Sequence, residues 1–144
     1  MANATNYLEN KLIDHLFRSA TAAKPPALYV ALYTAAPSDA GGGTEVAGGG
    51  YARVNVPPGD LNWTATQGGT TGVSSGSNGA TANAAAVTFA TPSANWGMLT
   101  HFAIFDAATG GNPLVWGPLN VTREVLVGDP APRFPAGSLA ITVA

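Results

Sequence analysis

Apolar residues recur at the spacing of an amphipathic helix near the N-terminus of the chain. They lie three or four positions apart, as one face of a helix requires, and they are Leu8, Leu12, Ile13, Leu16 and Phe17. The pattern predicts a helix over residues 6–18, which the paired prolines at 25 and 26 prevent from continuing. Asn6 is a suitable N-cap residue, and Glu9 three positions later completes a pair that resembles a capping box.

From residue 28 onward the apolar residues alternate with other residues, which is the period of a β-strand. The first such segment, 28–33, alternates leucine and valine with tyrosine and alanine. Further strands are predicted over 51–57, 84–90, 98–105, 113–116, 119–127 and 138–143.

A run of turn-forming residues, from Asp106 to Asn112, follows the strand predicted over 98–105. We therefore predict a hairpin whose two arms are 98–105 and 113–116. Strict alternation along the first arm places Met98 and Phe102 on one face of the strand and Leu99 on the other.

Short strands joined by Gly- and Pro-rich connections predict an all-β fold. We expect residues 1–144 to form a single antiparallel β-sandwich domain, jelly-roll-like, with one N-terminal α-helix. A parallel α/β fold needs crossover helices, and the sequence beyond residue 20 shows no helical pattern.

Two segments, 37–50 and 65–83, are rich in glycine and small polar residues, a composition typical of mobile loops. Ordering such residues costs about 1 to 2 kcal/mol each in backbone entropy, so an ordered state requires contacts that hold them. Partner chains are the first candidate for these contacts. The alternative is that Trp63 and Trp96 pin the segments to their own domain.

The chain carries few charges: 10% of its residues, with a net charge of −2, against about 25% charged residues in ordinary soluble domains. Burial of unpaired charge is the costly step in association, so such a surface suits a subunit of a larger assembly. The alternative is a free monomer kept soluble by hydroxyl and amide groups.

Several functional classes are disfavoured by the charges and the apolar runs. The six basic residues are scattered, so we expect no nucleic-acid partner. No apolar run approaches the roughly 18 residues of a membrane span, and the N-terminus lacks a signal-peptide pattern. We expect synthesis in the cytoplasm and no membrane partner. The absence of cysteine excludes disulfides and thiolate metal sites.

The sequence offers no convincing catalytic constellation. His15 follows Asp14, but adjacent helical residues point in different directions, so the two do not form a catalytic pair. We expect His101 to be a half-buried packing residue of a strand. Motifs for a nucleophile, a carboxylate pair or a calcium loop do not occur. We therefore predict no enzymatic activity, no cofactor, and no catalytic, cofactor-binding or metal-binding residues.

Large aromatic side chains are the other candidates for binding. We expect most of them to lie in the core and one or two to be exposed at contacts; they are Tyr29, Tyr33, Tyr51, Trp63, Trp96 and Trp116. A platform that binds glycans is the alternative role, but no polar cluster accompanies these residues in the sequence.

Several strings in the sequence resemble a family of small virion proteins of tailed bacteriophages, often labelled tail-fibre-like. They cover most of the chain in order and lie at 6–18, 26–37, 41–46, 49–54, 95–112 and 136–143. The resemblance implies a structural component of the virion, assembled in the cytoplasm of the bacterial host, with no catalytic residues to carry over.

Within the virion, the absence of internal repeats and of a shaft segment favours a capsid decoration or cement protein. Its partner would be the major capsid protein, and the chain is expected to form a homo-oligomer. The alternative is a tail or tail-fibre component that contacts tail proteins or a host surface receptor.

In the mechanism that we expect, the sandwich is rigid and its glycine segments lie across seams between capsid subunits. The helix either caps an open end of the sandwich, which we favour, or packs against a neighbouring copy. The candidate interface residues are Leu8, Leu12, Leu16, Gly41, Gly42, Gly43, Gly48, Gly49, Gly50, Gly68, Gly69 and Gly72.

Overall fold

The computed structural model describes residues 2–143, which form one α-helix and ten β-strands. The helix α1 spans Asn6–Phe17. The strands are β1 (Asn3–Ala4), β2 (Tyr29–Ala35), β3 (Thr44–Glu45), β4 (Val54–Asn55), β5 (Ala80–Ala82), β6 (Val87–Thr88), β7 (Gly97–Phe105), β8 (Pro113–Val125), β9 (Arg133–Phe134) and β10 (Ala140–Thr142). All their pairings are antiparallel, which confirms the all-β fold with one N-terminal helix.

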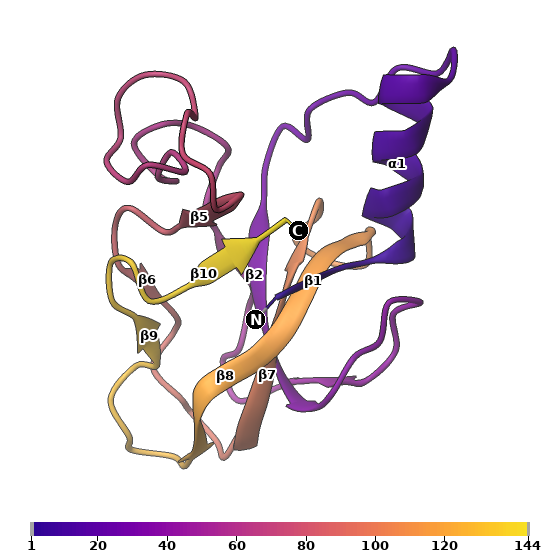
Figure 1. Ribbon diagram of the computed structural model, residues 1–144. Helices are drawn as coiled ribbons and strands as arrows, with labels where there is room; N and C mark the ends of the chain where they lie inside the picture. Colours follow the sequence, from indigo (N-terminus) through magenta and orange to yellow (C-terminus); the bar gives the residue numbers. More distant parts are fainter. Residues whose placement is uncertain (1, 144) are drawn as a thin grey trace.

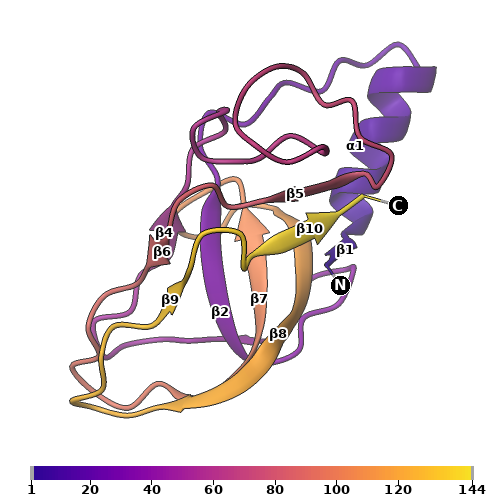
Figure 2. The ribbon, with the colours of Figure 1, turned by 60° about the vertical axis from the view of Figure 1, so that its left-hand side comes forward.

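The strands form two unequal layers (Figures 1 and 2). The larger sheet has the order β1-β8-β7-β2-β3, and β4 also pairs with β2. The second layer consists of two short ribbons, β5 with β10 and β6 with β9, which cross one face of the sheet. The main core lies between the layers, where Leu32 and Phe102 of the sheet share an apolar cluster with Val87 and Leu139 of the second layer.

Strand β7 departs from strict alternation, and this corrects the face predicted for Leu99. Leu99 is buried in the main core together with Phe102, whereas Met98 is 47% exposed. The register with β8 shifts between Leu99 and His101, and such an irregularity moves a side chain to the opposite face of a strand. The hairpin predicted for β7 and β8 is confirmed.

The two strands predicted at 113–116 and 119–127 are one strand, β8. Gly117 and Pro118, which lie between the two predicted strands, pair with Phe102 and His101 of β7. The irregularity lies further on: Pro118 and Arg123 are paired with β7, while residues 119–122 between them have no partner in the register. This unpaired stretch is a bulge of β8. The strands predicted over 51–57, 84–90 and 138–143 are shorter in the structure, where they correspond to β4, β6 and β10, whereas β2 and β7 are each one residue longer than predicted.

The start of α1 corrects the predicted cap by one residue. Thr5, fully buried, is the N-cap, and its hydroxyl oxygen accepts a hydrogen bond from the Leu8 amide at 3.3 Å. The Thr5 amide donates to the carbonyl oxygen of Leu114 in β8 at 3.0 Å. A threonine hydroxyl therefore satisfies one free amide of the first helical turn while joining the helix to the sheet. Within residues 2–143, no helix is long and apolar enough to cross a membrane.

Asn83, also fully buried, holds the C-terminal arm in place. Its side-chain amide donates to the carbonyl oxygens of Ala85 at 2.8 Å and Pro135 at 2.9 Å. Its side-chain oxygen accepts from the Leu139 amide at 2.8 Å. One buried polar side chain thus links the segment before β6 to the segment that carries β9 and β10.

We expect Asn83→Ala to lower the free energy of unfolding by about 2 to 4 kcal/mol, because it leaves the buried Leu139 amide and two partly buried carbonyl oxygens without their partner. Urea denaturation measures the effect. The matched control is Asn95→Ala, since Asn95 accepts one exposed bond from the Val127 amide and its loss should cost at most about 1 kcal/mol. Equal effects of the two variants would show that Asn83 does not hold the arm.

Candidate interaction surfaces

The apolar side of α1 is exposed along most of its length. Its apolar side chains become more exposed toward the C-terminal end of the helix: Leu12 is 38% exposed, Ile13 52%, Leu16 65% and Phe17 77%. We call these four residues the α1 face. The helix extends away from β1 and β8, alongside the upper end of the sheet (Figure 1). Of the predicted interface leucines, Leu8 instead packs against the main core.

The expectation that α1 caps the sandwich is therefore wrong. Its anchor is the first turn, where Thr5 and Leu8 contact β8 and the core, and no residue of the helix is buried. Four large apolar side chains on a short helix remain in water, which is typical of a surface that another molecule covers.

Charges divide unevenly around the helix. Successive residues of a helix are rotated by about 100° around its axis. Viewed along the axis, Glu9 therefore projects between Leu16 and Ile13, on the same side of the helix as the α1 face. Lys11 lies on the opposite side, where its ammonium group sits 5.5 Å from the centre of the Tyr7 ring. Arg18 follows there and forms an exposed ion pair of 3.2 Å with Asp14. The only charge on the α1 face is negative.

The glycine segment 37–50 is fixed by its own domain. Gly43 has a φ of +75°, and a Cβ there would lie 2.7 Å from the Ala35 carbonyl oxygen. Gly49 has a φ of +57°, a Cβ there would lie 2.9 Å from the Trp96 indole nitrogen, and its carbonyl oxygen accepts from that nitrogen at 2.9 Å. Only glycine permits these close approaches. The pinning by Trp96, kept above as an alternative, is what the structure shows.

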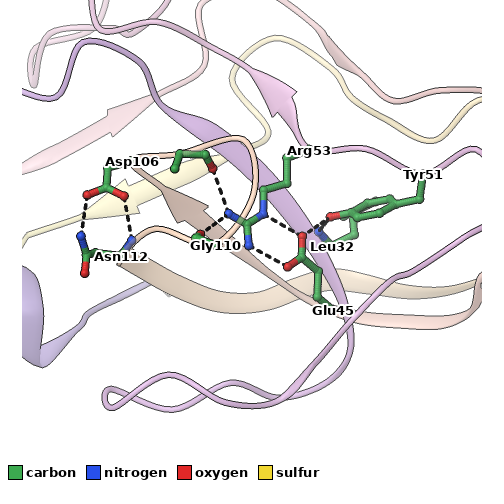
Figure 3. Close-up of polar contacts among 8 residues, drawn as sticks. Leu32, Glu45, Tyr51, Arg53, Asp106, Gly110 and Asn112 are labelled. Atoms are coloured by element: carbon green, nitrogen blue, oxygen red, sulfur yellow. Dashed lines mark hydrogen bonds and ion pairs between the residues drawn. The ribbon is translucent and has the colours of Figure 1, made fainter.

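An ion pair provides the strongest attachment of this segment (Figure 3). Arg53 donates from two nitrogens to the Glu45 carboxylate, both at 2.8 Å. Its third nitrogen donates to the carbonyl oxygens of Ala107 at 2.9 Å and Gly110 at 2.8 Å, in the turn between β7 and β8. The guanidinium carbon lies 3.6 Å from the centre of the Phe105 ring. One arginine therefore joins β3, the approach to β4 and the β7–β8 turn.

Tyr51 extends the network inward. Its hydroxyl donates to Glu45 at 2.9 Å and accepts from the Leu32 amide of β2 at 3.0 Å. Burial, helped by the negative charge of Glu45, raises the pKa of Tyr51 far above its usual value, although the bond from Leu32 opposes the shift. Burial alone would lower the pKa of Arg53, but the hydrogen bonds and charge of Glu45 raise it above its ordinary value.

The second glycine segment, 65–83, is organised by hydrogen bonds of its own. The Gln67 side chain donates to the Val73 carbonyl oxygen at 3.0 Å and accepts from the Ser75 amide at 2.9 Å. Thr81 donates to the Thr64 carbonyl oxygen at 2.8 Å and ties the end of the segment to its beginning. Each segment therefore makes contacts within its own chain. That partner chains also hold the two segments stays a prediction.

The remaining predicted interface glycines lie at the surface. Those with open space where a side chain would be are Gly41, Gly42, Gly48, Gly68, Gly69 and Gly72, and Gly50 lies beside Ser93. The structure places them on two separate loops and does not bring them together with α1. Whether they contact a partner stays a prediction.

A cavity that the sequence did not reveal lies between the layers, with a volume of about 470 Å³. Its apolar floor includes the core residues Leu32, Leu99, Phe102 and Leu139. Its walls are the bulge of β8, with Leu119 and Val121, and the arm around β9. Two exposed arginines, Arg123 and Arg133, also line it. We call it the β8–β9 cavity. Local periodicity could not reveal it, because it depends on the β8 bulge.

The side chains considered for chemistry stay apart. His15 is exposed and accepts from the Ala22 amide at 3.3 Å, and His101 is half-buried, 6.1 Å from Trp116 between ring centres. Residues 2–143 contain no group of three side chains able to hold a metal ion. Contrary to expectation, none of the six candidate aromatics is exposed; Tyr33 and Trp96 are buried and the other four are half-buried. They therefore form no exposed platform for glycans.

Comparison with known protein families matches residues 3–142 to the family described as "Podophage GP4 fiber I protein gp80". The match covers nearly the whole chain. The chain belongs to this family. It is therefore a structural protein of a bacteriophage, of a tail-fibre-like virion family, as the resemblance of its sequence implied. A search of curated proteins finds no match.

We expect Arg53→Met to lower the free energy of unfolding by about 2 to 4 kcal/mol, because it leaves the Glu45 carboxylate without its partner. Amide hydrogen exchange in 37–50 should accelerate at the same time. Arg18→Met is the control, since Arg18 is 71% exposed in its ion pair with Asp14 and such pairs contribute about 0.5 kcal/mol or less. Unchanged exchange in Arg53→Met would contradict the role of the ion pair.

Because folding raises the pKa of Tyr51, the free energy of unfolding should fall at alkaline pH. Because its unfolded pKa is about 10, this contribution is complete below pH 10 and is lost as pH rises above it. Tyr51→Phe should lower stability at pH 7 by about 1 to 3 kcal/mol, through the unsatisfied Leu32 amide. The difference between the two proteins should then narrow above pH 10. Denaturant titrations of both proteins from pH 7 to 11 test this prediction. A difference in the free energy of unfolding that stays constant over this pH range would refute it.

Proposed function

We propose that this chain is a non-enzymatic subunit of a bacteriophage fibre, held in the particle through the α1 face. The observation that carries the proposal is the exposure of Leu12, Ile13, Leu16 and Phe17 on a helix anchored only at its first turn. Contiguous apolar surface of this kind favours burial against a protein partner. The description of the family as a fibre protein supports the fibre rather than the shell.

Few charges surround this surface, and this supports the same proposal. Only 10% of the residues are charged, so the neighbourhood of α1 can lose its water at small electrostatic cost. The structural role requires no catalytic chemistry, and within residues 2–143 no three histidine or carboxylate side chains gather so that they could hold a metal ion.

A capsid decoration protein is the second candidate. It is favoured by the two packed layers of residues 2–143, within which no shaft-like segment extends. In that case the partner would be the major capsid protein, and the contact would be repeated over the shell.

We test the fibre proposal with Leu16→Gln/Phe17→Gln in the phage that encodes the chain. Glutamine keeps helix propensity and removes the apolar contact, so the variant should fold yet be lost from purified particles, and adsorption to the host should fall. Lys11→Gln/Arg18→Gln, on the opposite side of α1, is the control and should be retained. Retention of both variants in wild-type amounts would refute the attachment through the α1 face.

Copy number separates the two candidates. Quantitative gels of purified particles should show the chain in proportion to tail proteins, because fibres follow the symmetry of the tail. Abundance in proportion to the major capsid protein, with heat-sensitive heads when the chain is absent, would replace the fibre by the capsid role.

A further inference from the structure

Among the described residues, the β8–β9 cavity and the α1 face both offer apolar side chains to a partner. We propose that the α1 face of one copy docks into the β8–β9 cavity of a second copy. This inference deepens the proposed function, on which it rests, by naming the partner of α1 as the chain itself.

The cavity has the size and lining for large apolar side chains. Its volume of about 470 Å³ lies within the range of about 300 to 1,000 Å³ of pockets that enclose small ligands. Its apolar lining comes from the core residues Phe89, Leu99, Phe102 and Leu139, each at most 5% exposed, and from Val121, which is 78% exposed. Leu16 and Phe17, the two most exposed residues of α1, are the natural occupants.

The charges of the two surfaces are complementary. Arg123 and Arg133 are exposed where they line the cavity, and its lining includes no acidic residue of the described chain. Neither arginine forms an ion pair within residues 2–143. On the α1 face the single charge is that of Glu9, while Lys11 and Arg18 point away. A docked helix would thus bring one carboxylate toward two guanidinium groups and keep its cations distant.

A single copy cannot make this contact with itself. The start of α1 is tied to β8 by the bond from the Thr5 amide to Leu114 at 3.0 Å, and none of the cavity residues belongs to α1. In both ribbon views the helix stands apart from β9 (Figures 1 and 2). The face and the cavity can therefore be filled together only between copies.

The contact is heterologous: each copy offers one helix and one cavity to different neighbours. Such contacts form closed rings when the rotation between copies closes, and open chains when it does not. Two different variants must then complement each other, which an association through paired helices would not allow.

The test uses the purified full-length protein and sedimentation velocity at up to about 0.5 mM, a range that detects contacts with Kd near 1 mM. Wild-type protein should associate. Leu16→Gln/Phe17→Gln, altered in the helix, and Arg123→Glu/Arg133→Glu, altered at the cavity, should each be monomeric. Their equimolar mixture should form a 1:1 dimer, because the intact helix of one variant meets the intact cavity of the other.

An exchange of charges tests whether Glu9 faces the two arginines of the cavity in the contact. Adding Glu9→Arg to the Arg123→Glu/Arg133→Glu variant should lower the Kd of its self-association at least about tenfold, because opposite charges again face each other. Arg18→Glu, on the far side of the helix, is the control and should associate as the wild type does.

Three results would overturn the proposal: a monomeric wild type, association of the cavity variant alone, or a mixture that stays monomeric. A monomeric wild type combined with loss of the helix variant from particles would leave the proposed function standing, with another protein as the partner of α1. Self-association as described, with retention of the helix variant in particles, would leave this inference standing and refute the attachment through α1.

Discussion

The ion pair between Arg53 and Glu45 is the interaction on which the arrangement of this weakly charged chain depends. A buried charge pair stabilises a protein only when its hydrogen-bonding groups are satisfied, because desolvation otherwise outweighs the attraction. Here the carboxylate receives two guanidinium nitrogens and the Tyr51 hydroxyl, while the third nitrogen reaches the β7–β8 turn. Segments that are distant in the sequence are thereby joined, and the glycine segment 37–50 is attached to its own domain.

This internal order changes where binding must be sought. If the glycine segments needed neighbours to hold a shape, they would be the adhesive parts of the molecule. The Trp96 bond to Gly49 and the Gln67 bonds within the second loop instead attach both segments to their own chain. Apolar surface of the described residues is the other candidate for binding, and it includes the α1 face and the β8–β9 cavity. Rigid surroundings favour such a site, because less conformational entropy is lost on binding.

Sequence patterns were sufficient for local elements and failed where distant segments meet. The spacing of Leu8, Leu12 and Leu16 locates α1 to within a residue, and alternation locates the long strands. The cap at Thr5 was missed because its burial depends on β8. The face of Leu99 was wrong because a shift in register between two strands has no local signature. For the same reason only one part of the candidate site was predicted from the sequence, namely the leucines of α1, and the cavity was not.

The compact fold first favoured a shell protein, because fibres are commonly repetitive or extended. A head-to-tail contact weakens that objection, since a compact subunit then becomes the repeating unit and the assembly, not the chain, supplies the length. In such an arrangement the first copy would leave one cavity free and the last copy one helix free. Each end would therefore present a different surface, one an apolar hollow lined by Arg123 and Arg133 and the other an apolar helix with Glu9. A fibre needs this polarity, because one end must bind the particle and the other must face outward.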